Sequence, residues 1–157
     1  MIPKKIKNTT YRFQFRHERV GFTPLGVLFT EEQLKKILDL DLVQHQCHFN
    51  AAKVASLMKC EYCEGMFAGA FDHAFNSIEK DGQRFYFDAT EFINNAGDAS
   101  VVPSFDMVVF RAYSADEILK VYSDFEMAFV TTGIAYTHKM GSFTIDDDGK
   151  VVELKTA

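Results

Sequence analysis

The chain has 157 residues, which suffices for one domain with its own hydrophobic core. Hydrophobic residues make up 47% and charged residues 25%, the profile of a soluble globular protein, and no apolar run is long enough to cross a bilayer. A net charge of -5 argues against a general nucleic-acid-binding protein. No apolar segment follows the basic start, so we expect no signal peptide and a cytoplasmic protein without nucleic-acid or membrane partners.

The first third of the chain predicts one strand and two helices. Residues 10–17 alternate aromatic and polar side chains, as in a half-buried strand. The sequence Thr30-Glu31-Glu32-Gln33 has the spacing of a capping box, and apolar residues at helical spacing follow it, which predicts a helix at about 31–40. A second helix is predicted from near Cys47 to Met58, because apolar side chains recur on one face there.

The middle of the chain predicts a β-hairpin. Residues 73–79 and 83–88 flank Lys80-Asp81-Gly82, and an Asp-Gly pair between two strand-like runs is a strong hairpin signal. The rest predicts a strand over 107–113 and a helix from the capping box at Ser114 to about Phe129. Three short strands then follow, at 134–139, 142–145 and 151–154. Short connections favour antiparallel pairing, so the expected fold class is α+β.

The hairpin also predicts a contact between two polar side chains. With Asp81-Gly82 as a two-residue loop, Phe75 lies opposite Asp88 and His73 opposite Thr90. Residues two apart on a strand share a face, so His73 and Asp88 are diagonal neighbours, whereas a three-residue loop would separate them. An aspartate bound to one imidazole nitrogen fixes the tautomer and leaves the other nitrogen to accept a proton from a nucleophile.

The candidate nucleophile is Cys47, at the predicted start of the second helix. A thiol there lies at the positive end of the helix dipole, and a nearby imidazolium lowers its pKa further. Backbone N–H groups at the same helix start are candidate donors to an oxyanion. The residues thus predict a site with Cys47 as nucleophile, His73 as base and Asp88 as the group that orients the base.

These residues lie in segments that resemble the core of the transglutaminase-like superfamily, part of the papain-like group of cysteine enzymes. The segments are His73-Ala74-Phe75-Asn76, Asp81-Gly82 and Phe85-Tyr86-Phe87-Asp88-Ala89-Thr90. The family run is His-Ala-Trp, a turn with Gly, an aromatic-rich strand and Asp-Pro-Thr, and its nucleophilic Cys starts an upstream helix. The resemblance covers about residues 44–92, with Phe75 and Ala89 in place of the usual Trp and Pro.

The resemblance implies a fold and a chemistry. The nucleophile helix would pack on an antiparallel sheet, within a single domain over residues 1–157 of a small microbial or phage type. Cys47, His73 and Asp88 match the family's nucleophile, base and orienting acid, and Gln44 or Gln46 is a candidate side-chain donor to the oxyanion. The implied reaction is hydrolysis or acyl transfer at a peptide or amide bond of a peptide or protein substrate, without a metal or organic cofactor.

Two alternatives stay open. The first is a catalytically inactive domain of the same fold that binds a peptide or protein. The second is a zinc-stabilised interaction module, because Cys60-Glu61-Tyr62-Cys63 has zinc-ligand spacing and His45, Cys47 and His48 lie upstream. A further interpretation is that all three cysteines are small buried core residues, the usual state of a free cysteine.

Overall fold

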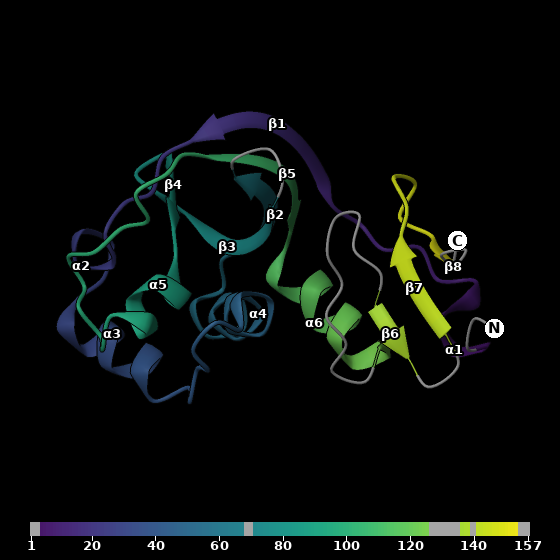
Figure 1. The fold of residues 1–157 in the computed structure, drawn as a ribbon, viewed down its shortest axis with the longest axis horizontal. Coiled ribbons are helices and arrows are strands. Elements are labelled where there is room, and N and C mark those ends of the chain that lie inside the picture. The colour runs from purple at the N-terminus through teal and green to yellow at the C-terminus, as the bar shows by residue number, and fades with distance from the viewer. Residues whose placement is uncertain (1–3, 68–70, 126–135, 139–140, 154–157) are drawn as a thin grey trace.

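The computed structural model describes residues 4–67, 71–125, 136–138 and 141–153. Its larger sheet is antiparallel throughout and has five strands in the order β1-β5-β2-β3-β4. Figure 1 shows this sheet curving over helix α4, with α3 and α5 on one side and α6 on the other. The expected α+β class is therefore confirmed.

The bounds of the elements are as follows. The larger sheet contains β1 (Gln14–Val20), β2 (Glu61–Phe67), β3 (Phe71–Lys80), β4 (Gln83–Phe87) and β5 (Met107–Tyr113). The helices are α1 (Lys4–Lys7), α2 (Leu25–Leu28), α3 (Glu31–Leu38), α4 (Cys47–Met58), α5 (Ala89–Asn94) and α6 (Ala115–Asp124). The smaller antiparallel sheet contains β6 (Tyr136–His138), β7 (Gly141–Ile145) and β8 (Val151–Glu153).

Helix α4 packs on the sheet through small side chains. Ala51 and Ala55 are buried in one cluster with Ala74 of β3 and Tyr62 of β2, and methyl groups let the helix approach the strands closely. Asn76 of β3 adds a polar contact, because its Nδ2 donates to Ala51 O at 2.8 Å. The start of α4 is thereby held in a fixed position relative to β3.

The β3–β4 hairpin has the predicted register. Lys80 pairs with Gln83, and Asp81 and Gly82 both have positive φ angles, 52° and 77°, as a two-residue type I′ turn requires. The prediction that Thr90 lies opposite His73 is wrong, because β4 ends at Phe87 and Thr90 lies in α5. The side chain of Asp88 accepts the N–H of Glu91 at 3.0 Å, so the chain begins a helix there and leaves the sheet.

The other predicted elements agree in part. The capping box at Thr30 is present, and β5 has the predicted bounds. The predicted strand 10–17 is displaced, because Tyr11 N–H donates to Gly149 O at 2.7 Å and the ladder with β5 begins only at Gln14. Helix α6 begins after its cap Ser114 as predicted, but it ends at Asp124 with Phe125 as its C-cap, short of the expected end at about Phe129. Residues 126–129 lie outside the described residues, as do 134–135, 139 and 154 of the predicted tail strands.

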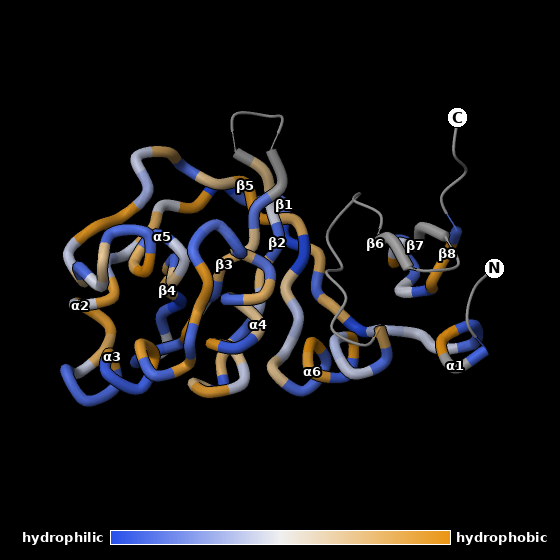
Figure 2. Tube along the Cα trace, turned by 60° about the horizontal axis from the view of Figure 1, so that its bottom comes forward, coloured by the Kyte–Doolittle hydropathy of each residue, from blue (hydrophilic) through white to orange (hydrophobic). Residues whose placement is uncertain are grey.

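Arg111 links the two sheets. Its guanidinium donates to Ile145 O at 2.9 Å and to Asp147 at 3.0 Å, and it lies over the ring of Phe13. Figure 2 shows that α3 and α6 each carry polar and apolar residues, as helices with one face on a core do. Within the described ranges, no helix combines the length and apolar character that a membrane span requires.

Candidate active site

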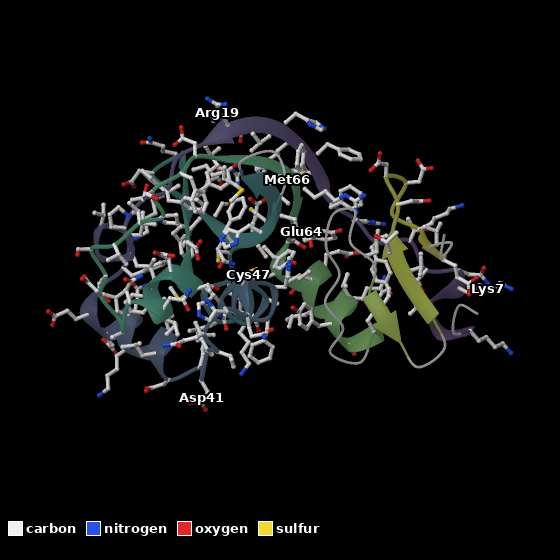
Figure 3. The ribbon with its side chains drawn as sticks, viewed as in Figure 1. Lys7, Arg19, Asp41, Cys47, Glu64 and Met66 are labelled. Carbon is white, nitrogen blue, oxygen red and sulfur yellow. The ribbon has the colours of Figure 1, made fainter. Side chains whose placement is uncertain are left out.

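The three residues predicted for the site come together from three elements. Cys47 is the first residue of α4, His73 lies on β3 and Asp88 immediately follows β4. His73 Nε2 lies 2.5 Å from Asp88 Oδ2, and the imidazole and the Cys47 thiol are close enough for each to shift the pKa of the other. Figure 3 shows Cys47 at α4, beneath the curved sheet. The sequence-predicted contact between His73 and Asp88 is confirmed.

Asp88 is held by both of its oxygen atoms. Oδ1 accepts the backbone N–H of Glu91 and caps α5, while Oδ2 faces His73. The side chain is only 2% exposed, so water competes little for either contact. The helix cap thus fixes the direction from which the carboxylate meets the imidazole.

The imidazole of His73 is held by aromatic neighbours as well. Phe75 stacks on it with ring centroids 6.0 Å apart, and Phe105 approaches it edge-on at 6.4 Å. Because Asp88 occupies Nε2, the ring nitrogen that remains for the Cys47 sulfur is Nδ1. His73 therefore has one nitrogen for the carboxylate and one for the thiol.

The loop before Cys47 is fixed by a buried amide that the sequence analysis did not identify. Asn50 is fully buried, and its side chain accepts the N–H of Val43 at 2.9 Å and donates to Val43 O at 2.8 Å and to Thr90 Oγ1 at 3.0 Å. These bonds join the loop, α4 and α5. A polar residue on the apolar face of the helix, three positions after Cys47, was the available signal.

The electrostatics of the site favour an ion pair. Burial raises the pKa of the Cys47 thiol, but hydrogen bonds to His48 and His73 and the charges of both rings lower it overall, to about 6. Burial lowers the pKa of His73, while the hydrogen bonds and charges of Asp88 and Cys47 raise it overall, to about 10. Both shifts favour a Cys47 thiolate beside a His73 imidazolium over the neutral pair.

The other two cysteines behave in the opposite way. Burial raises the pKa of Cys60 to about 12 and raises that of Cys63 further. They also belong to different packed clusters, Cys60 with Val54 and Phe87, and Cys63 with Phe75. Cys47 is thus the thiol that its surroundings make acidic, as a nucleophile requires.

The structure does not assemble the ligand set of the zinc alternative. In the part of the chain that the structure describes, no group of three or more His, Cys, Asp or Glu side chains is placed to hold a metal ion. The side chains of Gln44 and Gln46 are exposed, and Gln46 precedes α4 without a side-chain bond to the helix. Neither glutamine is fixed as a donor to an oxyanion.

A second polar group at Cys47 was not predicted as part of an active site. His48 Nδ1 lies 3.2 Å from the hydroxyl of Tyr62, which donates to Glu64 Oε2 at 2.8 Å. From the sequence, His48 is expected only as a candidate zinc ligand. The signal in the sequence was the alternation of Tyr62 and Glu64 on a strand, which places both on the face toward α4.

Comparison of the chain with models of protein families, with curated proteins and with solved structures finds no match. The fold and the site therefore describe the protein. It is an α+β protein in which a cysteine with a lowered pKa, at the start of a helix, lies near a histidine that hydrogen-bonds to a buried aspartate.

Proposed function

We propose that the protein is a cysteine-dependent hydrolase or acyltransferase that acts on a peptide or amide bond, of the transglutaminase-like, papain-like type. The observation that carries this proposal is the hydrogen bond between His73 and the buried Asp88, beside a Cys47 thiol whose pKa the neighbouring histidines lower to about 6. A structural cysteine has no need of a thiolate at neutral pH, whereas a nucleophile does.

The geometry supports a two-step reaction. The Cys47 thiolate forms a bond to the carbonyl carbon, and the developing oxyanion lies near the N–H groups at the start of α4. The His73 imidazolium gives its proton to the leaving amine, the C–N bond breaks and a thioester remains. Water or a second amine then adds, His73 takes its proton, and the C–S bond breaks to restore the thiolate.

The assigned roles explain why Asp88 is buried. The carboxylate stabilises the imidazolium formed in each step, and it holds Nε2 so that Nδ1 remains directed to the sulfur. Phe75 and Phe105 limit rotation of the ring. A site with these properties is arranged before substrate arrives, which lowers the cost of reaching the transition state.

A peptide chloromethyl ketone tests the proposal, because it alkylates a thiolate that a histidine activates. The expected result is one adduct per chain, mapped to Cys47 by mass spectrometry and absent in Cys47→Ala. The rate should rise with pH through a midpoint near 6, the pKa of the thiol. The matched control Cys60→Ala should react like the wild type, because Cys60 is buried and its pKa is raised.

Turnover is measured separately, as release of an amine from a panel of peptide amides and glutamine-containing peptides. Loss of turnover in Cys47→Ala and His73→Ala supports the proposed chemistry. A thiol that titrates near its ordinary value of 9.0 contradicts the proposal. An acidic Cys47 without any turnover of amide substrates would favour the inactive binding domain.

A further inference from the structure

A second chain of hydrogen bonds leads toward Cys47, and Asp88 is not part of it. It runs from Glu64 through the Tyr62 hydroxyl to His48 Nδ1, with distances of 2.8 and 3.2 Å. Tyr62 and Glu64 are buried, at 0% and 1% exposed. His48 directly follows Cys47 in the sequence, and its ring helps to lower the pKa of the Cys47 thiol. Two imidazoles therefore act on one thiol, and each is connected to a different carboxylate.

The direction of these bonds determines the tautomer of His48. The Tyr62 hydroxyl hydrogen is donated to Glu64, so the oxygen of Tyr62 acts as acceptor toward His48. Nδ1 of His48 must then carry a hydrogen. In the neutral ring this leaves Nε2 as the proton acceptor, and Nε2 becomes a donor only when the ring is an imidazolium.

The negative charge of the buried Glu64 carboxylate lies near a positive charge. Glu64 pairs in register with Arg111 of β5, whose guanidinium is buried and positive. Figure 3 labels Glu64 on β2 and Cys47 on α4, and the chain of hydrogen bonds joins these two elements. The other titratable groups around it are His73 of β3, Tyr113 of β5 and Tyr122 of α6.

We propose that His48 is a second base at Cys47, held by Tyr62 and Glu64 in the tautomer whose Nε2 accepts the thiol proton. The S–H bond breaks, the proton moves to Nε2, and the electron pair remains on sulfur. The inference rests on the proposed function, in which Cys47 is the nucleophile. It assigns the two rings different duties: His48 keeps the sulfur ionised while His73 exchanges its proton with the leaving and entering groups.

Three single variants, one double variant and one control variant test this role by alkylation with iodoacetamide across pH. In His48→Gln the midpoint for Cys47 should rise by about one unit, because the ring that helps to lower the thiol pKa is lost, and the rate at pH 6 should fall about fivefold. Tyr62→Phe removes one oxygen atom and should shift the midpoint in the same direction. Tyr86→Phe is the control. Tyr86 is also a buried tyrosine that donates to a carboxylate, Glu18, but it is not part of the hydrogen bonds that join Glu64, Tyr62 and His48.

The third variant, His73→Ala, separates the two bases. It should retain alkylation faster than a free thiol at pH 7, and the double variant His48→Gln, His73→Ala should lose that advantage. Nitrogen NMR of the wild type needs no substitution and should show His48 protonated at Nδ1 when neutral. A folded Tyr62→Phe protein should show a mixture of tautomers.

The outcomes separate the two proposals. Wild-type midpoints in His48→Gln and Tyr62→Phe, or a neutral His48 protonated at Nε2, would overturn the second base while leaving the first site intact. A low midpoint that rises in both variants, in a protein without amide turnover, would support the second base and refute the proposed enzyme.

Discussion

Replacing Asp88 by asparagine tests the site most directly, because the aspartate has two functions that this change separates. Asparagine is as good a helix cap as aspartate, so the bond from Glu91 N–H to the side-chain oxygen should persist. The atom facing His73 Nε2 changes from a charged oxygen at 2.5 Å to an amide. The variant should therefore keep α5 and lose the charge that stabilises the imidazolium.

The magnitude follows from the pKa of His73. Its rise from 6.5 to about 10, with burial acting against it, corresponds to about 5 kcal/mol in favour of the imidazolium. Asp88 and Cys47 share this energy, so loss of the charge at Asp88 should lower the pKa of His73 by about 2 units. The balance between ion pair and neutral pair then shifts by up to about a hundredfold toward the neutral thiol.

The assay is an NMR titration of the His73 imidazole, because the thiolate at pH 7 outlasts a loss of about 2 units between two pKa values of about 6 and about 10. The midpoint of His73 in Asp88→Asn should lie about 2 units below the wild-type midpoint. Ser114→Ala is the control and should keep the wild-type midpoint, because it removes the cap of α6, a helix whose start lies outside the site. A folded Asp88→Asn protein whose His73 titrates at the wild-type midpoint would remove Asp88 from the site and refute the reasoning.

Three further predictions concern stability. The wild type should exceed Asp88→Asn in unfolding free energy most below pH 6.5, and the difference should close as pH rises through 10, because a raised histidine pKa stabilises only while the ring is protonated. Asn50→Ala should cost about 3 kcal/mol in urea unfolding, since it leaves both backbone groups of Val43 without the amide. Gly65→Ala should prevent folding or cost at least about 3 kcal/mol, because a Cβ there would overlap the backbone oxygen of Val108. Gly82→Ala, in open space, should cost only about 1–2 kcal/mol for its positive φ.

The elements that position the site were predictable because their signals are local. The Asp-Gly pair determines a two-residue turn, and the turn determines the register that places His73 and Asp88 on one face. The helix from Cys47 to Met58 follows from its spacing of apolar residues. In both cases the decisive interactions lie within about a dozen residues of one another.

The parts that were missed depend on contacts between distant segments. Tyr11 pairs with Gly149 instead of extending β1, which no pattern within residues 10–17 reveals. Thr90 was expected on a strand because the hairpin pairing was continued beyond Phe87, where β4 ends and Asp88 caps a helix. The link from His48 to Glu64 joins α4 to β2 and depends on the curvature of the sheet over the helix.

The acidity of Cys47 is better explained by the whole arrangement than by any one contact. Burial alone makes a thiol less acidic, as Cys60 and Cys63 show in the same protein. The pKa of Cys47 is lowered instead, because two histidines act on the thiol. Each histidine is linked to a carboxylate, His73 directly to Asp88 and His48 to Glu64 through Tyr62. Burial still raises the pKa of Cys47, but the scarcity of water also strengthens the attraction between thiolate and imidazolium, and the two histidines outweigh the cost of burial.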